Sequence, residues 1–446
     1  MGNAATQTAK RAAYPAYKPS GVAWLGDVPD HWEVRRLKYA ADLINVKVDG
    51  ADNDLPYTGL EHIESWTGRR ITPNGDGVSE GQANLYRRGD VLFGKLRPYL
   101  AKAHAAESDG ICTGELLVLR PKVVQQKFLV DYVLNPDFVS IVDSSTYGAK
   151  MPRANWDFIA NLPALIPPGD EQRAIAAFLD RETARIDALI EKKRRQIELL
   201  QEKRSALISH AVTKGLDPHA AMKDSGIEWL GPVPAHWTAV RIRRLLTRLE
   251  QGWSPQCEGR EAGPDEWGIM KAGCANYGRF NELEHKALPV DVKPEEMYEI
   301  KPGDVIMSRA CGTVGLVGSA AYVENCRPRL LLCDKLFRLH PRRDRCDARY
   351  LHLALNSRSA RAQIEMSISG ADGLANNITQ PTIKDIVLAV PPLDEQQAIV
   401  THVRQATSRI DGVVAKVERS IDLLREHRTA LISAAVTGKI DVGREV

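Results

Sequence analysis

Residues 167–213 read PPGDEQRAIAAFLDRETARIDALIEKKRRQIELLQEKRSALISHAVT, and residues 391–437 read PPLDEQQAIVTHVRQATSRIDGVVAKVERSIDLLREHRTALISAAVT. The two stretches align without a gap, and about half of their positions are identical, which marks an internal duplication. From Glu171 to Thr213 the first copy contains neither proline nor glycine, and the second contains only Gly412. Each copy is therefore expected to form one long helix.

Apolar residues recur at steps of three and four along both copies, while Glu, Lys and Arg fill the outer positions. This stripe is typical of helices that pack against another helix, so we predict an antiparallel coiled-coil pair. At 1.5 Å per residue each helix would be about 60 Å long, more than a small domain needs for its own core. Packing of each helix on its own domain is the alternative. The residues predicted to pack between the helices are Ile175, Leu179, Ile186, Leu189, Ile197, Leu200, Leu207, Ile399, Val403, Ile410, Val417, Ile421, Leu424 and Leu431.

Both predicted helices carry signals for their ends. Asp170 and Asp394 follow prolines and are good N-cap residues, and Gly215 and Gly438 supply the stops. Two copies of the same apolar stripe bury each other most simply when a pseudo-twofold axis relates the two helices. That arrangement would place the regions between the helices at opposite ends of a rod.

A second duplicated block precedes each of those regions. Residues 20–32 read SGVAWLGDVPDHW and residues 225–237 read SGIEWLGPVPAHW, and these two tryptophan segments hold half of the eight tryptophans. We expect the tryptophans to pin a loop against a core rather than to stack on a ligand. The predicted parts of the chain are an N-terminal tail (1–19), a first domain (20–166), a central long helix (167–217), a second domain (218–390) and a C-terminal long helix (391–446).

The interiors between each tryptophan segment and the next long helix resemble each other far less, apart from echoes such as GDVL at 89–92 and GDVI at 303–306. Short runs of Val, Ile, Leu and Tyr alternate there with Gly, Pro, Asn and Asp, which predicts a mixed or mainly antiparallel sheet. The fold class is therefore α+β, written twice: two pseudo-symmetric domains separated by two long antiparallel helices. The strands and helices predicted here include strands at 90–93, 115–119, 335–339 and 386–390, and helices at 128–134 and 350–356.

Basic, aromatic and amide residues gather in loops of both interiors. Arg and Lys can hold phosphates or read guanine, Asn and Gln can read adenine, and aromatic rings can stack, so these loops are predicted to bind DNA. An ordinary solvated surface explains any single residue equally well, and only the clustering supports the prediction. The candidate DNA-binding residues are Lys95, Arg97, Tyr99, Lys102, Tyr147, Lys150, Arg153, Arg309, Asn376, Asn377, Thr379 and Gln380.

Composition excludes several classes of protein. The 446 residues carry a net charge of +3, which rules out a histone-like or polybasic protein, and 43% hydrophobic content is ordinary for a globular chain. No apolar run approaches the roughly 18–20 residues of a membrane helix. The seven cysteines include no Cys-x-x-Cys pair, so we expect a soluble cytoplasmic protein with no structural zinc. Met1-Gly2 with Thr6 matches the myristoylation pattern, but a flexible tail is the better interpretation.

No catalytic or metal-binding residue is predicted. The chain contains neither a phosphate-binding Gly-x-x-x-x-Gly-Lys-Ser/Thr loop nor a paired-histidine motif. Asp265, Glu284 and Lys286 have the residue types of a PD-ExK nuclease site, in which two carboxylates and a lysine could hold Mg²⁺ and activate water. Such a loose pattern arises often by chance, and the first half has no equivalent.

Taken together, these motifs resemble the specificity subunit of a type I restriction-modification system from Ser20 to the C-terminus. The resemblance depends on the tryptophan segments ending in VPDHW and VPAHW and on the two Pro-Pro…Glu-Gln segments, each opening a long helix that ends in Ala-Leu-Ile-Ser. The stretch GDVLFGKLRPY at 89–99 adds to it. Each motif is weak alone, whereas the duplicated set in this order is specific.

The resemblance implies a non-catalytic subunit with two target recognition domains, each reading one half of a bipartite, asymmetric site in double-stranded DNA. It implies that the helices set the unread spacer and dock two methyltransferase subunits, which bind S-adenosylmethionine and methylate adenine at N6. Motor-nuclease subunits with ATP and Mg would join for restriction, and this chain would bind no cofactor itself and no membrane. Ser308-Arg309-Ala310 stands where the first half has residues 94–97, a departure from the pattern. The alternatives are a Mg-dependent nuclease and a coiled-coil scaffold that binds protein only.

Overall fold

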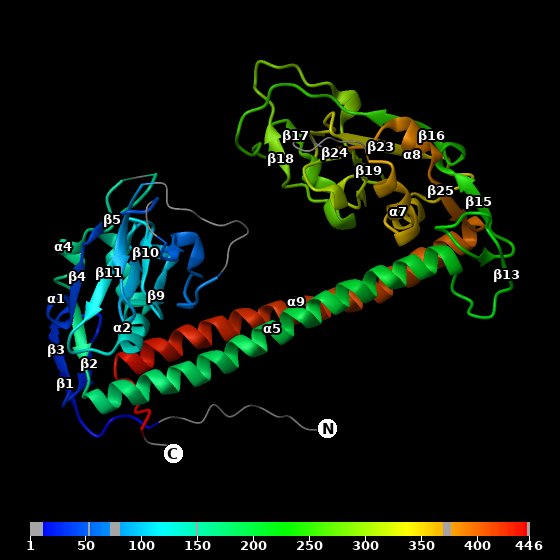
Figure 1. Cartoon of the computed structure of the whole chain (residues 1–446). Helices are drawn as coiled ribbons and strands as arrows, with labels where there is room; N and C mark the ends of the chain where they lie inside the picture. The colour runs from blue at the N-terminus through cyan, green and yellow to red at the C-terminus, as the bar shows by residue number, and fades with distance from the viewer. Residues whose placement is uncertain (1–11, 52–53, 72–80, 149, 369–375, 444–446) are drawn as a thin grey trace. The chain divides into compact units, whose positions relative to one another are not determined.

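The computed structural model describes residues 12–51, 54–71, 81–148, 150–368 and 376–443, and the chain divides into two compact units. Unit 1 comprises Met1–Arg194 and Glu418–Val446, and unit 2 comprises Arg195–Val417. Each unit mixes helices and strands, which confirms the α+β class (Figure 1). The division cuts each long helix in two, so the domain limits given above, which keep each helix whole, stay predictions.

Unit 1 contains twelve short strands among its described residues, and its central element is a four-stranded antiparallel sheet. Its strands are β1 (Tyr17–Pro19), β2 (Asp27–Pro29), β3 (Glu33–Arg36), β4 (Ala41–Ile44), β5 (Lys47–Asp49), β6 (Tyr57–Thr58), β7 (Gln82–Tyr86), β8 (Val91–Gly94), β9 (Ala103–Ala105), β10 (Gly110–Cys112), β11 (Leu116–Pro121) and β12 (Pro163–Ile166), and its short helices are α1 (Leu37–Ala40), α2 (Gln126–Val133), α3 (Pro136–Ser144) and α4 (Trp156–Ile159). The sheet order is β4-β11-β8-β9, and a second sheet, β5-β7-β10-β6, contains one parallel pair, β10 with β6.

Unit 2 repeats this plan. Its strands are β13 (Met222–Lys223), β14 (Val233–Pro234), β15 (Thr238–Arg241), β16 (Leu246–Gln251), β17 (Gly268–Met270), β18 (His285–Ala287), β19 (Val305–Ser308), β20 (Ala310–Cys311), β21 (Ala320–Tyr322), β22 (Leu330–Leu331), β23 (Leu336–Pro341), β24 (Asn376–Asn377) and β25 (Val387–Val390), and its short helices are α6 (Ala348–Leu355), α7 (Arg358–Met366) and α8 (Gln380–Asp385). The antiparallel sheet runs β16-β23-β19-β21, and β17 pairs parallel with β22. The mainly antiparallel sheets predicted for the interiors are thus confirmed.

The two long helices are α5 (Gly169–Lys214) and α9 (Leu393–Val436). Both begin earlier than predicted, because the carbonyl oxygens of Pro168 and Pro392 already accept hydrogen bonds from the N–H groups four residues on. Asp170 and Asp394 therefore lie in the first turn rather than at the N-cap, where a carboxylate still favours the positive end of the helix dipole. Gly215 and Gly438 follow the last turns with φ of +79° and +71°.

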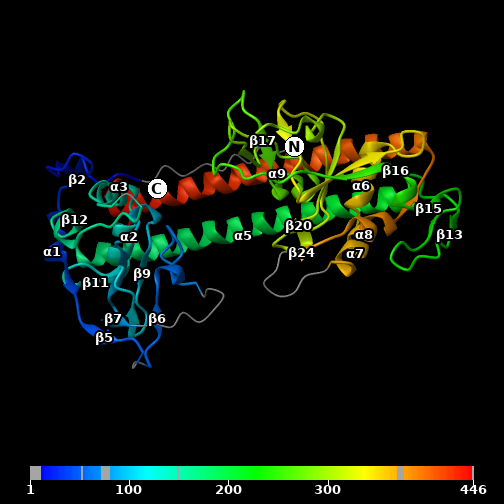
Figure 2. The ribbon, with the colours of Figure 1, turned by 90° about the horizontal axis from the view of Figure 1, so that it is seen from above.

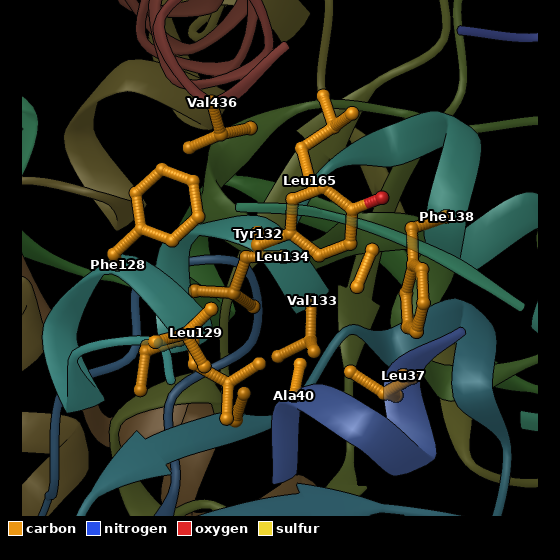
Figure 3. Packing of buried hydrophobic residues seen from close by; sticks show 14 of the residues in the cluster. Leu37, Ala40, Phe128, Leu129, Tyr132, Val133, Leu134, Phe138, Leu165 and Val436 are labelled. Carbon is orange, nitrogen blue, oxygen red and sulfur yellow. The ribbon is translucent and has the colours of Figure 1, made fainter. Parts of the chain in front are cut away.

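Within each unit the halves of α5 and α9 lie side by side and antiparallel, as Figure 1 and Figure 2 show. The helix ends enter the cores of the units. Ile175, Leu179 and Ile432 belong to the core of unit 1, and Ile399 and Val403 to that of unit 2. Figure 3 shows Val436 of α9 beside residues of α2 in the unit 1 core. The ends of α5 and α9 thus pack on domain cores, which was the alternative to helix pairing, and each long helix also lies against the other.

Most of the predicted apolar stripe is buried or half-buried between these ends. Ile186, Ile410 and Ile421 are buried although they lie outside the domain cores, as helix pairing requires. Leu189 was wrongly assigned to the stripe, because it is 39% exposed and Ile190 is buried in its place. Steps of three and of four from Ile186 both stay near one helix face, and in the structure Ile190, four residues on, is the one that is buried. Half-buried members of the stripe are Ile197, Leu200, Leu207, Leu424 and Leu431, and Val417 is buried.

The first tryptophan segment docks on α5 through its buried Trp32. The Trp32 indole N–H donates to Glu171 (2.8 Å), and His31 Nε2 lies 2.6 Å from the same carboxylate. Tyr14 also donates to Glu171 (3.2 Å) and belongs to the unit 1 core. The end of the region predicted as a tail thus contacts unit 1, through Tyr14 and through β1, which pairs with β2; residues 1–11, with the myristoylation pattern, lie outside the described residues.

The second tryptophan segment repeats this docking on α9. The Trp237 indole N–H lies 3.1 Å from the Glu395 carboxylate oxygens, and His236 Nε2 lies 2.8 Å from Glu395. We call each trio, Trp32–His31–Glu171 and Trp237–His236–Glu395, a tryptophan clamp. Both clamps hold a buried tryptophan against the first turn of a long helix, which confirms the expected role of these two tryptophans as packing residues.

Candidate nucleic-acid interface

In unit 1 the structure brings together the two basic loops that sequence predicted. The backbone N–H of Arg97 donates to the Pro152 carbonyl (2.8 Å), and that of Ala154 donates to the Lys95 carbonyl (2.9 Å). Tyr147 pairs with Arg153 through two backbone hydrogen bonds. Residues 94–102, 147–148 and 150–156 thus form one surface, here called loop pair 1; residue 149 lies outside the described residues.

Loop pair 1 presents cations and aromatic rings to its surroundings. Arg97, Tyr99 and Lys150 are exposed, Tyr147 is 64% exposed, and Lys95 is half-buried. Arg97 has a left-handed backbone (φ +50°), a conformation that costs a residue with a Cβ of order 1 kcal/mol. A strained, exposed arginine beside exposed tyrosines has the chemistry of phosphate binding and base stacking.

Two of the predicted residues in this loop pair have internal partners instead. The Lys102 ammonium donates to the Leu60 carbonyl (2.6 Å), and burial lowers the pKa of Lys102. The Arg153 guanidinium holds Glu115 through a bidentate contact (3.0–3.2 Å), which raises the pKa of Arg153 and neutralises its charge locally. Lys102 and Arg153 thus each have a partner within the protein, and their role in DNA contact stays a prediction.

Unit 2 contains an equivalent loop pair with different chemistry. β20 pairs antiparallel with β24, so that Ala310 faces Asn377 and Cys311 faces Asn376, and the Ile378 N–H donates to the Arg309 carbonyl (3.0 Å). We call residues 308–312 and 376–380 loop pair 2. The part of the predicted loop at 373–375 lies outside the described residues.

The side chains of loop pair 2 are mostly half-buried. The Arg309 guanidinium donates weakly to the Asp334 carbonyl (3.4 Å), and the Asn376 amide to the Gly312 carbonyl (3.4 Å). Gln380 begins α8, and Thr379 caps this helix by accepting from the Thr382 N–H (3.3 Å). Thr379 is thus an exposed helix cap, and its role in DNA contact stays a prediction.

The two loop pairs occupy the same place in their units. Each joins the loop after a central strand of the four-stranded sheet, β8 or β19, to the segment that enters a short helix, α4 or α8. That helix leads in each unit to the strand that pairs with the strand following the tryptophan segment, β12 with β3 and β25 with β15. One position in the fold is therefore cationic and aromatic in unit 1 and rich in amides in unit 2.

Sequence reasoning missed one exposed aromatic residue near loop pair 2. Tyr277 is 78% exposed with a left-handed backbone (φ +57°), at a kink inside η4 (Ala272–Gly278), which packs against β20. Gly278, which follows it with φ +72°, is a turn residue that could have pointed to this position. The corresponding loop of unit 1 holds Trp66 (φ +66°), which packs against the core instead.

The acidic residues of the nuclease alternative contact basic residues other than Lys286. Asp265 lies 3.8 Å from Arg329, and Glu284 lies 3.8 Å from Lys271, so the two carboxylates have separate cationic partners. Within the described ranges no group of three His, Cys, Asp or Glu residues is placed to hold a metal ion. Among the helices described, none combines the length and apolar character that crossing a bilayer requires.

Comparisons with known proteins agree with the repeated motifs, although no family model matches the chain. The chain is 29% identical over 206 residues to the type I restriction enzyme EcoEI specificity subunit of Escherichia coli, a match that spans 46% of this chain and 34% of that protein. It is 21% identical over 435 residues to the MjaVIII specificity subunit of Methanocaldococcus jannaschii, covering 93% of this chain and 94% of the relative.

A solved structure has the same fold. A chain from a study of complex assembly and conformational transition of the type I R-M system matches with a TM-score of 0.66 and 18% identity, covering 92% of this chain and 98% of that one. Both relatives bear the name of specificity subunits, and the match to the second includes both copies of the duplication. The chain is thus similar to specificity subunits of type I restriction-modification systems, over 93% of its length in the second of these matches.

Proposed function

We propose that this chain reads a bipartite, asymmetric site in double-stranded DNA, with loop pair 1 contacting one half and loop pair 2 the other. One observation supports this most directly: the two loop pairs occupy the same place in the fold and differ in chemistry. A cationic, aromatic surface suits phosphates and guanine, whereas asparagine amides suit adenine. Two unlike half-sites require such a difference.

The repeated parts suit two copies of one partner. Equivalent tryptophan clamps and long helices would offer the same surface twice, which two methyltransferase subunits could share. In this proposal those subunits bind S-adenosylmethionine and methylate adenine at N6, while motor-nuclease subunits with ATP and Mg join for restriction. The chain itself binds no cofactor, and the assembly works on DNA in the cytoplasm, where the seven free thiols would stay reduced.

The decisive experiment maps methylated adenines in DNA from cells that express the chain with its methyltransferase. We expect one two-part sequence motif, which disappears when the chain is removed. Replacing the unit 1 interior with that of another specificity subunit should change only one half of the motif. Methylation without a motif, or a change in both halves, would overturn the proposal.

Salt dependence separates a DNA reader from a scaffold that binds only protein. If the assembled complex contacts six phosphates, log affinity should fall with log salt at a slope of about −5. A complex that binds no DNA would favour the scaffold.

A further inference from the structure

Both helices carry an aspartate and an arginine in the middle of their buried stripes. When residue 167 is aligned with residue 391, Asp187 corresponds to Asp411 and Arg204 to Arg428. The antiparallel arrangement joins each aspartate to the arginine of the other helix, Asp187 with Arg428 and Asp411 with Arg204. The duplication therefore preserved one ion pair twice, once in each unit.

In unit 1 this ion pair also holds a loop of the recognition domain. Arg428 Nε lies 3.2 Å from Asp187, and the two side chains are 10% and 16% exposed. The remaining guanidinium nitrogens donate to the carbonyls of Trp66 (2.9 Å) and Thr67 (3.4 Å). Arg69 of the same loop lies 3.9 Å from Asp187. One aspartate thus connects both helices with the loop that follows β6.

In unit 2 the corresponding loop contacts the equivalent aspartate through an arginine that lies closer to it than Arg69 lies to Asp187. Arg279 lies 2.7 Å from Asp411, and Arg204 lies 3.5 Å from it. Burial lowers the pKa of Arg204, while Asp411 opposes that shift. Arg279 belongs to the loop after β17, which pairs parallel with β22 as β6 pairs with β10. The same loop of the fold is therefore attached at the same aspartate in both units, although the bonds differ.

Stability alone does not explain a charged group in this stripe. In unit 1 the two largely buried charges lose much of their hydration energy, and apolar residues of similar size would often stabilise the helix pair as well or better. In unit 2 the pair is partly solvated, because Arg204 is 26% and Asp411 38% exposed. Buried polar contacts are best known for fixing one geometry among several. An ion pair kept twice, beside interiors that diverged, indicates that geometry was the shared constraint.

The spacing of attachments shows which geometry is fixed. The tryptophan clamp holds Glu171 and the ion pair holds Asp187 on α5, and Glu395 and Asp411 have the same separation on α9. Sixteen residues of helix correspond to about 24 Å. A domain held at one point can pivot, whereas attachments at two distant points fix its angle to the helix pair.

We propose that Asp187 and Asp411 are positioning residues that fix the angle of each recognition domain on the helix pair and thereby restrict the DNA spacer that the complex accepts. This inference rests on the proposed function. Each aspartate acts through an arginine and a loop rather than by touching DNA. Its loss should widen the range of spacer lengths that are methylated without changing either half-site.

The test uses the complex with its methyltransferase and DNA duplexes that carry the native spacer or spacers one base pair longer or shorter. Asp187→Asn and Asp411→Asn should each reduce the preference for the native spacer by about tenfold or more, the factor that corresponds to about 1.4 kcal/mol. The matched controls are Glu198→Gln and Asp422→Asn, which break exposed ion pairs at equivalent positions of α5 and α9 and should leave the preference unchanged.

Two further variants separate positioning from folding. Arg279→Gln removes only the loop attachment in unit 2 and leaves the helix–helix pair, so it should relax spacer preference with normal thermal stability. Asp187→Leu with Arg428→Met replaces the ion pair with apolar residues, and it should relax the preference while the protein stays folded, which thermal unfolding checks. Unchanged spacer preference in these folded variants would overturn the inference. Absence of any two-part motif with the unaltered chain would instead overturn the proposed function.

Discussion

The tryptophan clamps and the loop pairs show opposite outcomes of the same duplication. In the clamps, Trp32 and Trp237 donate to equivalent glutamates of the two helices. In the loop pairs, the loop after the central strand holds Lys95 and Arg97 in unit 1 but Arg309 in unit 2, and the segment that pairs with it holds Arg153 in unit 1 but two asparagines in unit 2. The segments that contact the duplicated helices kept their chemistry, whereas the exposed loops diverged. The proposed function explains this divergence, because each loop pair would contact a different half-site.

The largest expected effect tests whether the two clamps are equivalent. Trp32→Ala and Trp237→Ala should each destabilise their own unit by about 3–5 kcal/mol, because each removes a fully buried ring and leaves a glutamate without its indole donor. Hydrogen exchange resolved by unit measures both losses. Trp229→Ala, which removes a 42% exposed ring, is the control and should cost under about 1 kcal/mol. Very unequal losses for the two buried tryptophans would break the comparison.

A second test concerns the glutamine that follows each clamp glutamate. Gln172 and Gln396 each accept one backbone N–H and donate to two backbone carbonyls. The partners of Gln172 are Gln125 (2.6 Å), Val123 (3.2 Å) and Pro167 (2.8 Å), and those of Gln396 are Asp347, Arg345 and Pro391. Either change to alanine leaves these backbone groups unpaired and should cost about 2–3 kcal/mol by chemical denaturation, compared with little for the exposed Gln201→Ala.

A pH test should distinguish the units. His352 of α6 donates to the Gly278 carbonyl (2.9 Å), and burial lowers its pKa from 6.5 to about 4. The unfolded chain then binds more protons between these values, so unit 2 should lose about 2 kcal/mol as pH falls from 7 to 5. In unit 1 the glycine equivalent to Gly278 is Gly68, and it faces Val130, which has no titratable group. Urea denaturation of His352→Gln should lack this component, and an unchanged pH profile would contradict the assignment.

The smallest expected change in stability accompanies a clear change in DNA binding. Arg97→Gly should leave stability unchanged or raise it by up to about 1 kcal/mol, because glycine relieves the left-handed backbone. The same change should weaken DNA binding and reduce the salt slope by about 1. Ala101→Gly, at φ +45° in the same loop, should affect stability alone. If Arg97→Gly binds DNA normally, loop pair 1 does not use this arginine.

Local patterns predicted much of the fold. The long helices, the α+β interiors and the mainly antiparallel sheets followed from residue spacing and turn residues, because these signals act over a few neighbouring positions. Such signals do not specify which side chain enters a shared interface. Leu189 fits the apolar stripe by composition, yet Ile190 is the residue that is buried. Tyr14 likewise joins a core only because α5 and a tryptophan segment meet there.

The candidate site shows the same division. The sequence alone showed an internal duplication in which the tryptophan segments and long helices are similar and the interiors differ. A duplication can be recognised by comparing two stretches of one sequence, without knowing the fold. Only tertiary structure decided that the loops meet in pairs, that Lys102 and Arg153 have partners within the protein, and that Asp187 contacts both the other long helix and a distant loop. These facts depend on contacts between residues far apart in the chain, which form only when the cores pack.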